Sequence, residues 1–331
     1  MNTSWGRSLF CIVIVLGVTF SPLNGAWGAG PTKIRLHLEW KIGGQHAPLF
    51  AAKELGFYRE RGLDVEILEG SGSSDTVKLL ANGSVEFGYL NALMNIVGRQ
   101  RGIPIVSLAV VDQKTPVSII SLKESNITQP RDLLGKVIGA NPKSTTYQIL
   151  EGFLLKQGIR KDQLTIAPIG WGVEPLLSKQ VQALMAYTNN EPPLILAKTG
   201  QVVNEILVSD YGISLYGITL TTTERFLQEN SEASKNFVLA TLKAWRFAEE
   251  NPEKVIEVFL KLRPEQERAT AMATLKASFK LHHSDATAKG GPGWQTEEGW
   301  AQTQDVLQSI GLIQAKVDKL STVFSNRFLG Q

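Results

Sequence analysis

The chain has 331 residues, 43% hydrophobic and 20% charged, and its 34 Lys and Arg against 31 Asp and Glu give a formal charge of +3. This balance argues against a nucleic-acid-binding protein, which normally needs a dense basic face. The length predicts one large or two medium domains, with enough buried surface to fold without disulfides or a structural metal.

The N-terminal segment has the order of an export signal. A positively charged start is followed by the apolar run 9–16 and then by small residues up to position 28. The run is too short to span a bilayer core of about 30 Å, so we expect a signal peptide over 1–28, cleaved before Ala29. An N-terminal membrane anchor is the alternative. Cys11 is the only cysteine, so the exported chain would have no thiol nucleophile and no cysteine-bound metal.

The first part of the exported chain alternates strand and helix patterns. Ile34, Leu36 and Leu38 share one face at period two, which predicts a strand over 33–39. Further strands are expected at 64–68, 85–89 and 103–111, with helices at 48–55, up to 82 and at 92–100. This βα rhythm predicts a parallel sheet covered by helices.

A second copy of the rhythm starts near residue 137, and the end of the chain reads as helix only. The expected strands are 137–140, 164–169, 183–187 and 204–208, with a helix at 145–157. The expected C-terminal helices are 231–250, 252–262, 265–281 and 296–310.

Two short strand-like runs, 117–121 and 218–222, flank the second copy, and we expect the chain to cross between two lobes there. We therefore predict an α/β protein with two lobes, each a mostly parallel sheet flanked by helices, and a helical C-terminal segment. Lobe I would comprise 29–118 and 220–331, and lobe II 119–219.

The expected ligand site is the cleft between the lobes, because ligands of open α/β sheets bind beyond the carboxyl ends of the strands. The segments that follow the strands are rich in aromatic and neutral polar residues, and they contain no arginine, so bidentate recognition of an anion is disfavoured. Aromatic faces suit an uncharged planar heteroaromatic solute, whose polar edge Asn and Glu would bind. The candidate ligand-binding residues are Trp40, His46, Ser71, Ser73, Tyr89, Asn91, Ser144, Thr145, Trp171, Tyr187, Asn190 and Glu191.

Plainer interpretations stay open for several of these residues. Trp40 and Trp171 could pack inside a lobe, and His46 could cap the helix that follows it. Glu191 could complement the dipole of a helix that begins before two prolines. The Gly-Ser run 70–74 is similar to a phosphate loop, but it lacks the third glycine of a dinucleotide loop and the Gly-Lys-Ser/Thr of a P-loop.

No catalytic or metal-binding motif stands out in the sequence. There is no Gly-x-Ser-x-Gly elbow and no Asp-rich calcium loop, and His46 is distant in sequence from His282 and His283. We therefore expect no metal, no cofactor and no enzymatic activity.

Several stretches together resemble one known family. They are Leu-Glu-Trp at 38–40 with His-Ala-Pro at 46–48, the run 51–58 followed by 62–65, the run 80–88, and Tyr-Thr-Asn-Asn-Glu-Pro at 187–192. The pattern is similar to periplasmic solute-binding proteins of ABC importers, in the branch that covers nitrate, sulfonate and taurine receptors and the thiamine-pyrimidine (NMT1/THI5-like) proteins. This resemblance implies a type II periplasmic binding protein whose two lobes close on a solute.

Within that branch, the chain looks most like receptors for pyrimidine precursors and for riboflavin. The resemblance implies that Trp40, His46, Tyr187, Asn190 and Glu191 surround the ring of the ligand. It also implies a monomeric periplasmic receptor whose partner is an ABC permease in the inner membrane. A sulfonate, taurine or nitrate receptor, a sensory subunit, and a pyrimidine-synthesis enzyme on the same fold are the alternatives. The family resemblance implies that the fungal pyrimidine synthases of this fold need clustered cysteines, and residues 29–331 contain none, which argues against an enzyme.

Overall fold

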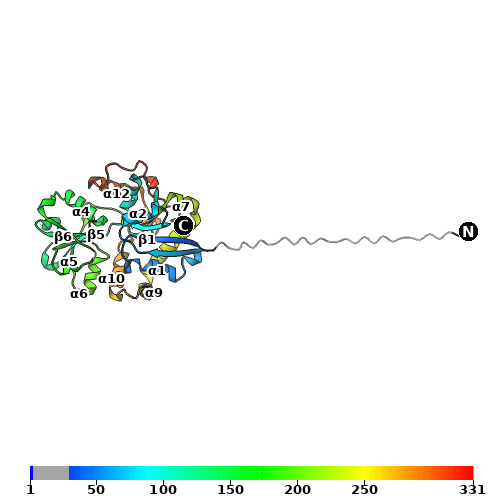
Figure 1. Cartoon of the computed structure of the whole chain (residues 1–331), viewed down its shortest axis with the longest axis horizontal. Helices are drawn as coiled ribbons and strands as arrows, with labels where there is room; N and C mark the ends of the chain where they lie inside the picture. Colours follow the sequence, from blue (N-terminus) through cyan, green and yellow to red (C-terminus); the bar gives the residue numbers. More distant parts are fainter. Residues whose placement is uncertain (3–29, 143, 171, 331) are drawn as a thin grey trace. The chain divides into compact units, whose positions relative to one another are not determined.

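The computed structural model describes residues 1–2, 30–142, 144–170 and 172–330. Pro31–Gln331 form one compact unit, separate from Met1–Gly30. The framework of this unit is a pair of five-stranded sheets, each with helices packed around it (Figure 1). Apart from its first two residues, the predicted signal peptide 1–28 lies outside the described residues.

The first sheet has the strand order β2-β1-β3-β10-β4. β1 pairs in parallel with β2 and β3, while β10 pairs antiparallel with β3 and β4. Ile34, Leu36 and Leu38 are fully buried, as the period-two pattern predicts. The strands are β1 (Thr32–Leu38), β2 (Leu63–Leu68), β3 (Phe87–Asn91), β4 (Ile105–Val110) and β10 (Ile218–Thr223).

The second sheet repeats this plan with the order β7-β6-β8-β5-β9. β6 pairs in parallel with β7 and β8, and β5 pairs antiparallel with β8 and β9. The strands are β5 (Val117–Leu122), β6 (Val137–Ala140), β7 (Thr165–Pro168), β8 (Ala183–Tyr187) and β9 (Val203–Leu207).

In each sheet four strands point the same way and one strand opposes them. The opposing strands are β5 and β10, the two runs at which the chain passes from one sheet to the other. The predicted fold class is confirmed: two mostly parallel sheets of mixed pairing are flanked by helices. Because both sheets are built this way, the carboxyl ends of their parallel strands define one edge of each.

The helices that follow the strands of the first sheet are α1 (Ala47–Glu54), α2 (Ser73–Ala81) and α3 (Leu93–Gln100). Those of the second sheet are α4 (Thr145–Lys156), α5 (Glu174–Leu177) and α6 (Glu191–Thr199). The C-terminal helices are α7 (Glu224–Glu229), α8 (Ser231–Glu250), α9 (Pro252–Leu262), α10 (Arg268–Phe279), α11 (Asp285–Gly290) and α12 (Glu297–Ser309).

The C-terminal region has two short helices more than the sequence pattern predicts, α7 and α11. Each begins at a hydroxyl cap: the Thr223 side chain accepts from the Phe226 amide, and the Ser284 side chain accepts from the Thr287 amide. A helix of six residues is too short to show a clear hydrophobic periodicity in the sequence. The capping hydroxyl was therefore the sequence signal that could have predicted each helix.

Packing of α8 and α9 against α1 covers one face of the first sheet. Phe237 of α8 is fully buried and lies 5.5 Å from the ring of Tyr58 and 4.2 Å from that of Phe87. Burial of such a side chain contributes about 2–3 kcal/mol, so the C-terminal helices complete the core of this sheet.

One apolar cluster includes residues from both sheets. Leu90 of β3, Ile119 of β5 and Trp300 of α12 belong to it. A Cβ on Gly152 would lie only 2.3 Å from the Cβ of Ile310, so α4 and the end of α12 approach closely. The sheets are therefore joined by packed side chains as well as by β5 and β10.

Candidate functional site

The candidate site lies between the carboxyl ends of the two sheets. Two narrow cavities, of about 20 Å³ and about 30 Å³, share Trp40 and Tyr187 in their walls. Each holds about one water molecule, so a ring-sized solute fits only when the sheets move apart. Of the predicted residues, the cavity walls contain Trp40, Tyr89, Ser144, Tyr187, Asn190 and Glu191.

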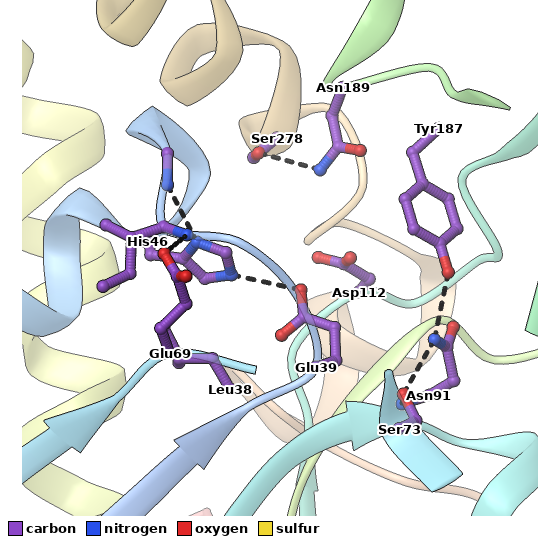
Figure 2. Close-up of polar contacts among 12 residues, drawn as sticks. Leu38, Glu39, His46, Glu69, Ser73, Asn91, Asp112, Tyr187, Asn189 and Ser278 are labelled. Carbon is purple, nitrogen blue, oxygen red and sulfur yellow. Dashed lines mark hydrogen bonds and ion pairs between the residues drawn. The ribbon is translucent and has the colours of Figure 1, made fainter. Parts of the chain in front are cut away.

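A hydrogen-bond network connects the two sheets across the site. Asn91 ends β3, and its amide nitrogen donates to the Tyr187 hydroxyl at the end of β8 over 3.1 Å (Figure 2). The same nitrogen lies 3.1 Å from Ser73 Oγ and 3.4 Å from Thr145 Oγ1. Neither cavity is lined by Asn91, Ser73 or Thr145, which are all buried. Their hydrogen bonds therefore stabilise the cavity wall from behind.

The aromatic side chains of the site meet edge to face. The rings of Trp40 and Tyr187 are 6.2 Å apart with an interplanar angle of 73°. Burial raises the pKa of Tyr187 to about 12, so its hydroxyl keeps its proton at neutral pH. Trp40 follows β1 and Tyr187 ends β8, so each sheet contributes one ring.

Glu191 is the first residue of α6, and its carboxylate is held by its neighbours. It accepts from the Tyr187 amide over 2.8 Å and from the Asn190 side-chain nitrogen over 2.9 Å. Burial raises the pKa of Glu191, and these hydrogen bonds only partly oppose the rise. Glu191 begins a helix and also lines a cavity, so its position is compatible with both interpretations, and its ligand-binding role stays a prediction.

His46 is fully buried and lines neither cavity. The Gly43 amide donates to its Nδ1 over 3.3 Å, so the proton is on Nε2, which donates to Glu39 Oε1 over 3.1 Å. The ring also lies 6.0 Å from that of Tyr89, edge to face. His46 thus orients Glu39 and does not face a cavity itself.

The predicted serines and threonine have different positions. Ser144 lines a cavity and caps α4, because its Oγ accepts from the Tyr147 amide. Ser71 is exposed and donates to Asp75 over 2.7 Å, so the structure does not bring it to the cavities.

Trp171 lies outside the described residues, although its neighbours Gly170 and Gly172 line one cavity.

The sequence analysis missed two buried carboxylates, Glu39 and Asp112, which line the same cavity. They are 6% and 3% exposed. Burial, together with the charge of Glu39, raises the pKa of Asp112 well above its ordinary value. Asp112 follows the predicted strand 103–111, so the strand-end rule could have found it, whereas Glu39 falls within the predicted strand 33–39 and follows the observed β1.

Another missed residue is Ser278 of α10, which also lines this cavity. Asn189 donates to Ser278 Oγ over 3.0 Å (Figure 2). The bond joins the loop after β8 to the C-terminal helices, and a contact 89 residues apart leaves no sequence signal.

A larger cavity, of about 290 Å³, lies on another side of Trp245. Its walls include Leu242, Trp245 and Glu249 of α8, with His282 and His283 after α10. Glu249 Oε1 lies 3.1 Å from His282 Nδ1 and 3.1 Å from His283 Nε2. Trp245 lines both this cavity and the cleft cavity, and His282 Nε2 lies 3.6 Å from Asp112 Oδ1 of the cleft.

Within the described ranges, no group of three or more His, Cys, Asp or Glu side chains is arranged to hold a metal ion. The same part of the chain contains no helix that is both long and apolar enough to cross a membrane.

The fold is that of a type II periplasmic binding protein. It matches the alkanesulfonate-binding protein SsuA from Xanthomonas axonopodis pv. citri, bound to MOPS, with a TM-score of 0.67 at 16% identity over 90% of this chain and 100% of that one. It matches the periplasmic nitrate-binding protein NrtA from Synechocystis PCC 6803 with a TM-score of 0.65 at 16% identity over 90% and 87% of the two chains.

The chain belongs to the NMT1/THI5 like family, whose sequence model matches residues 44–255. It is 25% identical to a formylaminopyrimidine-binding protein of Halalkalibacterium halodurans, over 81% of this chain and 82% of that one. It is 24% identical to the riboflavin-binding protein RibY of Chloroflexus aurantiacus, over 86% and 82%. It is also 26% identical to a 4-amino-5-hydroxymethyl-2-methylpyrimidine phosphate synthase of Saccharomyces cerevisiae, over 70% and 72%. The relatives thus include both binding proteins and an enzyme.

Proposed function

We propose that this chain is the extracytoplasmic receptor of an ABC importer and that it captures a small planar heteroaromatic solute, of the pyrimidine-precursor or flavin kind. The edge contact between Trp40 and Tyr187 carries the proposal, because it brings one ring from each sheet to the same place. A flat solute between them would exchange this contact for two aromatic contacts, each worth about 0.5–1.5 kcal/mol beyond area burial.

The polar edge of the solute would be bound by Asn190 and Glu191. A carboxylate only accepts hydrogen bonds, so Glu191 favours a solute with an amino group or a ring N–H. The relatives named for formylaminopyrimidine and for riboflavin support this chemical class.

In this proposal the two sheets mark the two lobes, with 29–118 and 220–331 in one and 119–219 in the other. The strands β5 and β10 would form the hinge, and the cross-sheet bonds would favour the closed form. Closure around the solute would create the surface that an ABC permease in the inner membrane recognises. A signal peptide over 1–28 would deliver the receptor to the periplasm, where it would act as a monomer.

The synthase relative makes catalysis the second candidate function. Covalent catalysis on such a solute calls for an activated nucleophile, and Cys and Lys are two of the side chains that can act as one. Among the described residues that line the two cleft cavities, none is Cys or Lys. This composition disfavours a mechanism that uses a Cys or Lys nucleophile in the described walls.

Anion receptors are the third possibility, since structural neighbours bind alkanesulfonate or nitrate. Sulfonate and nitrate need strong cationic donors, arginine above all. The described walls of the cleft cavities contain no arginine, which disfavours such ligands.

A thermal-shift panel with the purified exported chain tests the proposal. It includes formylaminopyrimidine, riboflavin, taurine and nitrate, and chromatography of each mixture checks for turnover. A shift with a pyrimidine or flavin and no new product is expected. A shift with taurine or nitrate alone, or consumption of a pyrimidine, would contradict it.

A further inference from the structure

The cleft contains an acidic pair that the proposed function does not yet use. Glu39 and Asp112 both line the smaller cavity and are almost fully buried. Figure 2 shows both carboxylates on the side of the site that the first sheet provides, across from Tyr187. Glu39 Oε1 accepts from His46, but Glu39 Oε2 is buried and has no hydrogen-bond partner among the described residues.

The surroundings offer this pair little positive charge. The Gly43 amide donates to His46 Nδ1, and His46 Nε2 lies 3.1 Å from Glu39 Oε1. His282 Nε2 lies 3.6 Å from Asp112 Oδ1, beyond hydrogen-bond distance. Burial lowers the pKa of His282 below its usual value, even though Glu249 beside it acts in the opposite direction. Neither Lys nor Arg occurs in the described part of the cavity wall.

Three titratable groups face Asp112 and bear on its pKa. They are Glu39 after β1, the Tyr89 hydroxyl from β3 and His282 after α10. Desolvation raises the pKa of Asp112, and the like charge of Glu39 raises it further. A cation placed between the two carboxylates would offset the repulsion between Asp112 and Glu39. It would also compensate part of the desolvation cost, so the pKa of Asp112 would fall.

We propose that Glu39 and Asp112 form a subsite for a cationic group of the bound solute, a protonated amine or ring nitrogen. Because burial and Glu39 raise the pKa of Asp112, binding of this group should lower that pKa again and displace a proton held by Asp112 to solvent. The inference rests on the proposed function and narrows its ligand from an uncharged ring to a cationic one. An ammonium group offers three donors and no acceptor. It would therefore supply Glu39 Oε2 with a donor and the acidic pair with a counter-charge, whereas a neutral hydroxyl would supply a donor but no counter-charge.

A matched pair of probes tests the subsite. The first is 4-amino-5-hydroxymethyl-2-methylpyrimidine, and the second is the same ring with an aminomethyl group, which is protonated at neutral pH. Isothermal titration of the exported chain should show roughly 10- to 100-fold tighter binding of the aminomethyl probe, the range of hydrogen bonds to charged groups. Equal affinities, or a preference for the hydroxymethyl probe, would overturn the subsite and leave the proposed receptor function intact.

Substitutions assign the preference to the acidic pair. Asp112→Asn should abolish the preference, whereas Asp64→Asn, the same change at an exposed position on β2, should preserve it. A preference that survives in Asp112→Asn would overturn the assignment.

Proton counting provides the second readout. Titrations with the aminomethyl probe in buffers of different ionisation enthalpy should show release of a proton, up to about one per ligand, in the wild type and in Asp64→Asn, and none in Asp112→Asn. Absence of release in the wild type would overturn the proton step. Failure of every ring probe to bind, with Trp40→Ala giving the same null result, would overturn the receptor function itself.

Discussion

Asn91 and Tyr187 come from different sheets, and the Asn91 side-chain amide donates to the Tyr187 hydroxyl over 3.1 Å. Tyr187 also lines both cleft cavities. Its hydroxyl therefore links the wall of the site to the contact between the sheets. A change at this one atom should therefore report on closure rather than on ring stacking.

Tyr187→Phe removes the hydroxyl and keeps the ring. One neutral hydrogen bond contributes about 0.5–1.5 kcal/mol, so ligand affinity should fall about 2- to 10-fold while the aromatic contact with Trp40 persists. Small-angle scattering of the ligand-free protein should show a larger radius of gyration. An unchanged radius together with unchanged affinity would mean that the bond does not stabilise the closed form.

Much of the fold could be predicted from the sequence because the information was local. Period-two runs and strand-to-helix alternation gave both sheets, and the rule that sites follow strand ends found Trp40, Asn91 and Tyr187. The same rule passed over Glu39 because it reads as the last polar position of the first strand.

Other features of the site depend on long-range packing. The burial of His46 follows from contacts between Gly44–His46 and α10, elements more than two hundred residues apart. The Asn189 contact with Ser278 also joins residues far apart in the sequence, so no local sequence pattern predicts it. Which carboxylate lacks a counter-charge is likewise a property of the assembled cavity.

Trp40→Ala should weaken binding more than it weakens the fold. Trp40 is only partly buried and lines both cavities, so its removal deletes ring contact with the solute. We expect an affinity loss of about tenfold or more and a loss of folding free energy near 1 kcal/mol. The matched control is Trp300→Ala, at a fully buried residue of α12, which should cost about 3–5 kcal/mol. Equal losses of stability in the two variants would identify Trp40 as a packing residue.

Gly44→Ala should destabilise the protein through a backbone clash. A Cβ at Gly44 would lie 1.9 Å from the Ala271 carbonyl oxygen of α10, so the helix must move. The expected cost is about 1–3 kcal/mol or more, measured by urea unfolding. Because α10 holds Ser278, the Asn189 bond should weaken as well.

Gly43→Ala is the neighbouring control. Its added Cβ would meet the end of the Gln45 side chain at 2.5 Å, and a flexible side chain can move away. This variant should lose less than about 1 kcal/mol. Equal costs at the two glycines would show that the close approach of α10 is not the cause.

Asp112→Asn should stabilise the ligand-free protein, and more so as the pH rises. Because burial raises the native pKa of Asp112, the folded state binds its proton more tightly than the unfolded state, where the pKa is about 3.9. This carboxyl group therefore makes the wild type less stable as the pH rises from the unfolded value to the raised native value. The amide does not titrate, so the difference in melting temperature between Asp112→Asn and the wild type should be small near pH ~4 and should grow towards pH ~8. Asp64→Asn, at an exposed position, should follow the wild-type curve at every pH. A constant loss of stability in Asp112→Asn at every pH would instead mean that the carboxylate has a stabilising partner in the native state.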